Sequence, residues 1–327
     1  MLKRNSEKML LIGVWANRNW ILGNWLTEVK IRAPKMFSIL WLPFIFAGKR
    51  QIEKFFPKVL PTRRSYFFSY LTIFESYLAK NSNKIINRSL IMYPHNEPEL
   101  GSLDHQVKIL NKSFAVYFFC SFDANQLIKA GLEPAKVRIS HCAVDVDCVL
   151  TNIYPKDPRM VVLASKYGPR KGLELLPDII KNRPNLNFVC LGRGWENFIA
   201  STKIHDLPNF TYLELNKQSR NEFFSKARIF LSLSNLEGGP VPLIEAMAMG
   251  VYPIATKTGF ALDLITPQSN GQLISTKPSL SEVLVALDAA SLAPELVPYR
   301  ELTWDRMASM MISDHHKIIK LNDGSGS

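Results

Sequence analysis

Two glutamates eight positions apart, Glu237 and Glu245, flank residues well suited to hold an anion. The segment Ser232–Gly250 reads SLSNLEGGPVPLIEAMAMG. Its first residues continue an apolar run that predicts a short buried strand, and the adjacent glycines and proline predict a loop. The apolar residues from Val241 to Met249 recur with helical spacing and predict a helix. The first glutamate is therefore expected on a loop and the second on the following helix.

A Gly-Gly loop that opens a helix is a general anion-binding arrangement. Gly238 and Gly239 let the backbone approach a ligand closely, and the free N–H groups at the start of a helix attract negative charge. Carboxylates beside such a site suit hydroxyl groups, from which they accept hydrogen bonds. A phosphate with a sugar on either side meets both demands, so the segment predicts a sugar-nucleotide site.

The sequence E-GGPVPLI-E followed by AMAMGVYPIAT resembles the Glu-x7-Glu motif of retaining GT-B glycosyltransferases, in particular family 4 (glycosyl transferases group 1). The resemblance implies that Glu237 lies against the donor sugar and acts at the reaction centre. It implies that Glu245 binds the nucleotide ribose and that the Gly238-Gly239 backbone contacts the diphosphate. The alternative is that both acids are solvated side chains at a helix edge, as most glutamates are.

Basic residues follow two other predicted strands. In the family, an arginine and a lysine clamp the donor diphosphate, and Lys171-Gly172 fits the second part of that pattern. Lys166 stands at the arginine position, where it keeps the charge without the bidentate fork, and Arg170 is the alternative source of that fork. Arg193, within Gly-Arg-Gly, resembles the Gly-x-Gly turn near the nucleotide. The alternative is an ordinary solvated basic surface.

The first half resembles the family less closely. His95, in His-Asn-Glu-Pro after a predicted strand, resembles a His-Glu-Pro motif whose histidine faces the donor sugar and the reaction centre, and it is a catalytic candidate. A structural hydrogen-bonding role is the alternative. Asn17 and Arg18 occupy the acceptor-side loop, where relatives are often glycine-rich. Cys142–Asp145 resembles an Asn-Gly-Val-Asp segment that closes the first domain in relatives, without its glycine.

Apolar runs alternate with helical patterns through the second half, which indicates a parallel sheet covered on both faces. The expected strands are Met9–Trp15, Leu90–Tyr93, Phe114–Ser121, Met160–Ala164, Leu186–Leu191, Phe210–Leu215, Arg228–Ser234 and Val251–Ala255. Apolar periodicity also predicts a helix over Arg64–Ala79.

The predicted fold class is α/β of GT-B type: two Rossmann-like domains facing across a cleft, with a C-terminal helix crossing back to the first. The predicted domains are an acceptor-side domain over 1–155, a nucleotide-sugar domain over 156–300, a returning helix over 301–320 and a tail over 321–327. The linker is placed at Tyr154–Pro158, which is polar and rich in proline.

Composition narrows the class of protein. The 327 residues are 47% hydrophobic and 21% charged, as in a globular protein, and no signal peptide or apolar stretch long enough to span a bilayer is apparent. The four cysteines lack metal-ligand spacing and are expected to be reduced core residues of a cytoplasmic protein.

Charge is uneven along the chain. Residues 1–156 hold 22 Lys and Arg against 11 Asp and Glu, which is +11 of the net +12. Residues 30–64 hold nine of these basic residues with interleaved aromatics and a single acid, Glu53. Such a segment suits an anionic membrane surface, and hence peripheral attachment at the inner face of a membrane. A basic solvated face is an equal alternative, and no nucleic-acid-binding signature is present.

Together these features predict a retaining glycosyltransferase that moves a sugar from a nucleoside-diphosphate sugar to a glycan or lipid-linked glycan, in cell-surface polysaccharide or lipopolysaccharide synthesis. No cofactor or metal site is predicted. The alternatives are a GT-B sugar-nucleotide epimerase and an inactive GT-B binding protein. An NAD-dependent dehydrogenase is disfavoured, because no GxGxxG follows an early strand.

Overall fold

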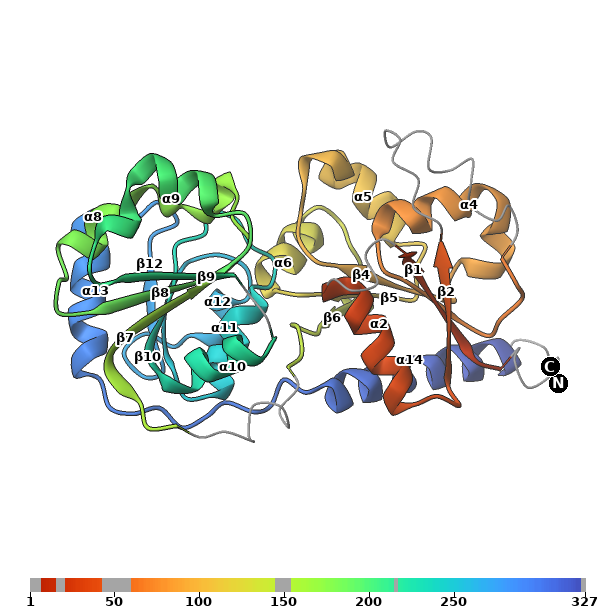
Figure 1. The fold of residues 1–327 in the computed structure, drawn as a ribbon. Coiled ribbons are helices and arrows are strands. Elements are labelled where there is room, and N and C mark those ends of the chain that lie inside the picture. Colours follow the sequence, from red (N-terminus) through yellow and green to blue (C-terminus); the bar gives the residue numbers. More distant parts are fainter. Residues whose placement is uncertain (1–6, 16–20, 43–59, 145–153, 215–216, 325–327) are drawn as a thin grey trace. The chain divides into compact units, whose positions relative to one another are not determined.

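The computed structural model describes residues 7–15, 21–42, 60–144, 154–214 and 217–324. The chain forms two compact units: the first comprises the residues up to His141 together with those from Trp304 onward, and the second comprises Cys142–Thr303. Each unit is built on a six-stranded sheet (Figure 1). None of the described helices combines the length and apolar character needed to cross a bilayer.

The sheet of the first unit has the order β2-β1-β3-β4-β5-β6, and every neighbouring pair is parallel. Its strands are β1 (Met9–Val14), β2 (Phe37–Leu42), β3 (Tyr66–Phe68), β4 (Ser89–Tyr93), β5 (Ala115–Phe118) and β6 (Val137–Ile139). In a parallel sheet all carboxyl ends lie at one edge, which is where ligands bind in open α/β folds.

Helices cover both faces of this sheet. They are α2 (Ile21–Arg32), α4 (Leu71–Ile85), α5 (Leu103–Leu110), α6 (Ser121–Lys129) and α14 (Trp304–Gly324), with short turns η3 (Pro98–Leu100) and η4 (Pro134–Lys136). Side chains of a strand alternate between the two faces. Phe68 of β3 therefore packs against Phe74 of α4, with ring centroids 5.2 Å apart, and its neighbour Phe67 packs against Trp25 of α2, at 5.4 Å.

The sheet of the second unit has the order β12-β11-β10-β7-β8-β9 and is also parallel. Its strands are β7 (Asp157–Ala164), β8 (Asn187–Gly192), β9 (Phe210–Glu214), β10 (Ala227–Ser232), β11 (Tyr252–Thr256) and β12 (Gln272–Ile274). The order places β10 between β7 and β11. The loops that follow these three strands are therefore neighbours.

The helices of the second unit lie in two layers, with α8, α9 and α13 on one side of the sheet and α10, α11 and α12 on the other (Figure 1). They are α8 (Leu176–Lys181), α9 (Glu196–Thr202), α10 (Lys217–Lys226), α11 (Val241–Ala248), α12 (Ala261–Leu264) and α13 (Leu280–Leu292), with turns η5 (Pro169–Lys171), η6 (Leu173–Leu175) and η7 (Ile204–Asp206). Aliphatic and aromatic side chains from the strands and the first layer form one continuous core.

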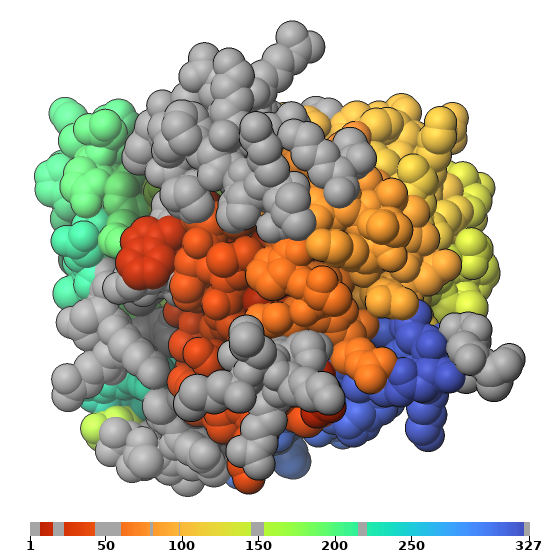
Figure 2. All heavy atoms as spheres, turned by 90° about the vertical axis from the view of Figure 1, so that its right-hand side faces the viewer, coloured from red at the N-terminus to blue at the C-terminus, as the bar shows by residue number. Residues whose placement is uncertain are grey.

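The last helix, α14, is attached to the first unit by buried polar contacts. Asp314, which is 1% exposed, accepts hydrogen bonds of 2.9 Å from both the Tyr117 hydroxyl and Arg138 Nε. Ser65 Oγ lies 2.7 Å from Nδ1 of His315, which is also buried. Figure 2 shows residues of α14, in blue, beside orange residues from the earlier part of the first unit. These contacts join residues roughly 180 to 250 positions apart in the sequence.

The structure contains every strand named in the sequence analysis, with ends shifted by a few residues. The predicted helix over Arg64–Ala79 is wrong in its first part, because Tyr66–Phe68 forms strand β3 and the helix begins at Leu71. Strands β2, β3, β6 and β12 were not predicted. Asp157, placed in a linker, already belongs to β7.

Candidate active site

The candidate donor site is built by three loops at the carboxyl edge of the second sheet. They follow β7, β10 and β11, which are adjacent strands. The β7 loop carries Lys171, the β10 loop carries Glu237, and the β11 loop ends at Gly259. The predicted donor residues on the first two loops are thus brought together, although about 65 positions separate them in the sequence.

The β7 and β10 loops are held against each other by the backbone. The Asn235 N–H donates a 2.7 Å hydrogen bond to the Arg170 carbonyl. Gly172 adopts a left-handed conformation with φ +62°, and a Cβ at this position would lie 2.1 Å from the Leu233 carbonyl oxygen. Only glycine fits so close to that backbone, so packing requires glycine at position 172.

The β11 loop supports the Gly-Gly segment from its other side. The Phe260 N–H donates to the Gly238 carbonyl at 3.2 Å, and Thr256 Oγ1 donates to the Ser234 carbonyl at 2.5 Å. A Cβ on Gly259, whose φ is +52°, would lie 2.6 Å from the Gly238 carbonyl oxygen. The backbone that precedes α11 is therefore held in one conformation.

Lys171 and Glu237 form an ion pair through Nζ and Oε1. The side chains are 15% and 9% exposed, so the pair is largely shielded from water. Shielding strengthens the attraction relative to a surface pair. The pair places one cation and one carboxylate directly beside the Gly238-Gly239 backbone.

Glu245 lies on α11 and is 9% exposed. Its neighbour is Cys142, whose pKa is raised by burial first and by the Glu245 charge second. The Cys142 thiol also lies 3.9 Å from the Gly239 carbonyl oxygen. The segment expected to close the first domain thus begins inside the second unit, which starts at Cys142.

The other predicted basic residues line the same edge. Lys166 and Arg170 are exposed on the β7 loop, and Arg193 is exposed on the loop after β8. The Tyr167 N–H donates to the Arg193 carbonyl at 2.9 Å, which joins these two loops. A Cβ on Gly192 would lie 1.8 Å from the Ser165 carbonyl oxygen, so glycine is required at this turn too.

His95 belongs to the first unit, at the carboxyl end of β4. Its Nε2 lies 3.1 Å from Glu97 Oε1, and its side chain is 15% exposed. Asn96 holds the loop in place, because its Oδ1 accepts a 3.0 Å hydrogen bond from the fully buried Gln106. The Tyr93 hydroxyl in turn donates to Gln106 Oε1 at 2.6 Å.

Asp123, at the start of α6, is a second acid beside this loop. Burial raises the pKa of its carboxyl, while hydrogen bonds from Cys120 and from the Asn96 backbone and the nearby His95 act in the opposite direction. Asn17 and Arg18, predicted for the acceptor-side loop, lie outside the described residues.

Several residues at the carboxyl edges of the two sheets were not predicted from the sequence to take part in a site. Glu97 is the clearest, and its position two residues after His95 in a proline-bounded loop could have revealed it. Gln106 could not be predicted, because its partners depend on how α5 folds over β4. Gly259, in Thr-Lys-Thr-Gly after a predicted strand, carried a turn signal that could have been read.

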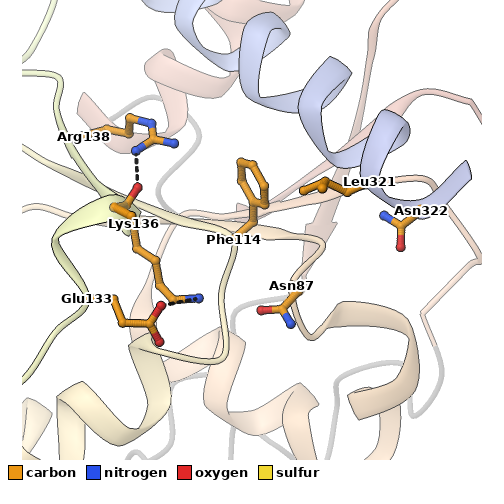
Figure 3. A pocket seen from close by; sticks show the side chains of 8 residues that line it. Asn87, Phe114, Glu133, Lys136, Arg138, Leu321 and Asn322 are labelled. Carbon is orange, nitrogen blue, oxygen red and sulfur yellow. Dashed lines mark hydrogen bonds and ion pairs between the residues drawn. The ribbon is translucent and has the colours of Figure 1, made fainter. Parts of the chain in front are cut away.

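A pocket elsewhere in the first unit is not part of this site. Figure 3 shows it, with a volume of about 460 Å³ and a lining of Asn87, Phe114, Glu133, Ala135, Lys136, Arg138, Leu321 and Asn322. Asn87 and Phe114 precede β4 and β5, and three further lining residues precede β6, so the pocket lies at the amino edge of the sheet. Its cations already have protein partners, since Lys136 donates to the Ser113 carbonyl and Arg138 pairs with Asp314.

Comparison with known proteins gives a family match for the second half. Residues 152–292 match the family "Glycosyl transferases group 1". The chain is 34% identical over 101 residues to a provisionally assigned glycosyltransferase 41 of Sulfolobus islandicus filamentous virus, covering 30% of this chain and 27% of that protein. It is 26% identical over 118 residues to glycogen synthase of Fusobacterium nucleatum, covering 34% and 26%. The matched segment spans about a quarter of the length of these relatives.

Solved structures match nearly the whole chain at low identity. Sucrose-phosphate synthase from Thermosynechococcus elongatus has a TM-score of 0.73 at 14% identity and covers 96% of this chain and 100% of that one. The lipopolysaccharide outer core galactosyltransferase WaaB has a TM-score of 0.69 at 15% identity, with 94% and 99% covered. HepE of Anabaena, in complex with UDP and glucose, has a TM-score of 0.66 at 14% identity, with 97% and 99% covered. Residues 152–292 thus match the glycosyl transferases group 1 family, and the chain as a whole has the fold of GT-B glycosyltransferases.

Proposed function

We propose that this protein is a retaining glycosyltransferase of family 4 that transfers a sugar from a nucleoside-diphosphate sugar to a glycan or lipid-linked glycan. One observation carries the proposal: Lys171 and Glu237 meet beside the Gly238-Gly239 backbone at the carboxyl edge of the second sheet. A cation and a carboxylate thus lie beside a Gly-Gly backbone of the kind that binds phosphate. The family match over residues 152–292 supports the same reading.

In the proposed reaction the diphosphate departs with the electron pair of the bond that joined it to the sugar. As the bond between the anomeric carbon and the phosphate oxygen lengthens, negative charge builds on the diphosphate. The acceptor oxygen forms the new bond to the anomeric carbon, and the proton of its hydroxyl passes to the departing phosphate oxygen. Lys171, with Lys166 or Arg170 beside it, and the N–H groups at the start of α11 would stabilise that charge more in the transition state than in the ground state. Fixed cations of this kind supply the role that a divalent metal has in other transferases, so we propose a metal-independent reaction.

The remaining roles divide between the two units. Glu237 would accept hydrogen bonds from donor-sugar hydroxyls and Glu245 from the ribose, while Arg193 lies beside the nucleotide. His95, aligned by Glu97, would act at the reacting centre and contact the acceptor hydroxyl. HepE, of the same fold, has been solved with UDP and glucose, which supports UDP sugars as the first donors to try.

The acceptor belongs to the same proposal. We propose a glycan or lipid-linked glycan in cell-surface polysaccharide or lipopolysaccharide synthesis, reached from the cytoplasm at the inner face of a membrane. The excess of basic residues in the first half favours an anionic surface. Much of the basic segment 30–64 lies outside the described residues.

The proposal is tested by turnover of UDP-glucose, UDP-galactose, GDP-mannose and ADP-glucose with a panel of saccharide and lipid-linked acceptors. We expect release of one nucleoside diphosphate and a glycoside whose anomeric configuration, measured by NMR, matches the donor. Lys171→Met should reduce this rate by about 100-fold or more, because a largely shielded cation beside the leaving group is lost. Lys226→Met is the matched control, since Lys226 is ion-paired on the surface of α10. A nucleotide sugar converted to its epimer without use of an acceptor would contradict the proposal, as would no release from any donor.

A further inference from the structure

The Lys171–Glu237 pair is placed too firmly to be an incidental surface contact. Lys171 is followed by Gly172, whose backbone is pressed against the Leu233 carbonyl. The Glu237 backbone is held in turn, because Gly259 approaches the Glu237 and Gly238 carbonyl oxygens so closely that a Cβ would lie 2.6 to 2.7 Å from them. Both partners therefore extend from rigid loops, and at 15% and 9% exposure neither side chain is free to point into water.

This placement creates a conflict with the ligand. Lys171 is the least exposed of the three predicted diphosphate cations, and Lys166 and Arg170 are exposed. A diphosphate bound to Lys171 must share it with the Glu237 carboxylate, and it also brings negative charge close to that carboxylate. Both effects oppose binding, and neither is strongly screened in a shielded site.

From this geometry we infer that the Glu237 carboxylate lowers the affinity of the site for the nucleoside diphosphate product and so promotes its release. This inference rests on the proposed function. With a sugar nucleotide bound, the sugar hydroxyls donate hydrogen bonds to Glu237. These hydrogen bonds offset the weakening of the ion pair when Lys171 is shared with the diphosphate. After transfer the sugar has left, and the carboxylate loses those donors. Glu237 then pairs fully with Lys171 again, and the diphosphate loses its most shielded cation.

Removal of the Glu237 charge should raise the affinity for the diphosphate product and lower steady-state turnover. Glu237→Gln keeps the shape of the side chain and removes its charge, so Lys171 becomes available to phosphate. We expect UDP, or whichever of UDP, GDP and ADP the wild type binds, to bind this variant about tenfold more tightly, which is about 1.4 kcal/mol. We expect the sugar nucleotide to gain less, and steady-state turnover to fall with stronger inhibition by the diphosphate. Isothermal titration with both ligands measures the first effect.

Three variants make the experiment decisive. Glu237→Asp keeps the charge and should show no tightening, and Glu237→Ala removes the charge by a second route if the glutamine variant does not fold. Glu222→Gln breaks a 2.6 Å ion pair with Lys226 on α10, away from the site, and should leave all affinities unchanged. A folded, neutral variant at position 237 that binds the diphosphate equally or more weakly would overturn the inference. A wild type that binds no nucleoside diphosphate would instead overturn the proposed function, and the inference with it.

Discussion

At the scale of single residues, the most informative side chain is His95. Its Nε2 lies 3.1 Å from Glu97 Oε1. Gln106 donates a hydrogen bond to this loop and accepts one from the Tyr93 hydroxyl. A histidine oriented by a carboxylate is a common arrangement for a group that moves or stabilises charge in a reaction. The predicted donor residues, by contrast, all belong to the second unit. Loss of His95 should therefore affect the chemical step and spare donor binding.

We predict that His95→Ala slows transfer by about 100-fold or more and leaves the dissociation constant for the donor within about twofold of the wild type. Turnover and isothermal titration on the same preparation check the two parts. His105→Ala is a suitable control, because His105 is also paired with a glutamate, Glu75, at 3.1 Å but is half exposed on α5. A loss of donor affinity equal to the loss of rate would contradict a role in the chemical step.

At the scale of elements, the candidate donor site depends on glycines that let three loops meet. Gly172→Ala would place a Cβ 2.1 Å from the Leu233 carbonyl oxygen at a left-handed φ of +62°. We predict a destabilisation of about 1 to 3 kcal/mol and a weaker donor affinity, because the β7 loop must move away from the β10 loop.

Gly168 supplies the matched control for that prediction. It lies on the same loop, its φ of 179° is ordinary extended backbone, and a Cβ there meets nothing within 4 Å. Gly168→Ala should therefore keep both the thermal midpoint and the donor affinity of the wild type. Equal effects of the two substitutions would show that close approach at Gly172 does not govern the site.

The last helix gives a prediction about pH. Burial, and then the neighbouring His316, lowers the pKa of His315 to about 4 from an ordinary value of 6.5. Between these values the unfolded chain binds a proton that the folded chain does not, so stability falls as pH decreases from about 6.5 to 4. The contribution is on the order of 3 kcal/mol and is fully present above pH 6.5.

We predict that His315→Gln, which can keep a hydrogen bond to Ser65, loses part of this pH dependence. The thermal midpoint of the wild type should fall more steeply between pH 7 and pH 4.5 than that of the variant. His105→Gln removes a half-exposed histidine of the same unit and should keep the wild-type slope. Parallel curves for wild type and His315→Gln would show that this buried ring does not control the response.

At the scale of the whole molecule, the two units differed in how much of them could be predicted. Strands of the second unit are buried apolar runs that end in glycine- and lysine-bearing loops, and both signals are local in sequence. In the first unit, β3 is three consecutive aromatic residues within Arg64–Ala79, a stretch whose apolar periodicity also fits a helix, and β6 is three half-buried residues. Strands that short are defined by the neighbours they pair with, which a single sequence does not reveal.

The site shows the same division between local and long-range information. Motif residues such as Lys171, Glu237 and Glu245 were predicted because each stands in a recognisable local pattern. The ion pair between Lys171 and Glu237 was not predicted, because it depends on β7 and β10 being neighbours in the sheet. The buried contacts of Asp314 with Tyr117 and Arg138 were likewise out of reach, since they join segments nearly 200 residues apart.

The central claim is that the carboxyl edge of the second sheet binds a nucleoside-diphosphate sugar, and ligand-induced stabilisation tests it most directly. Thermal unfolding of wild type and Glu245→Ala would be followed with UDP, GDP and ADP sugars. A ligand at about 100 times its dissociation constant stabilises the fold by about 2.7 kcal/mol, which shifts the midpoint measurably. We predict that sugars of one nucleotide shift the wild type and fail to shift the variant. No shift from any sugar nucleotide, or an equal shift in both proteins, would contradict the account.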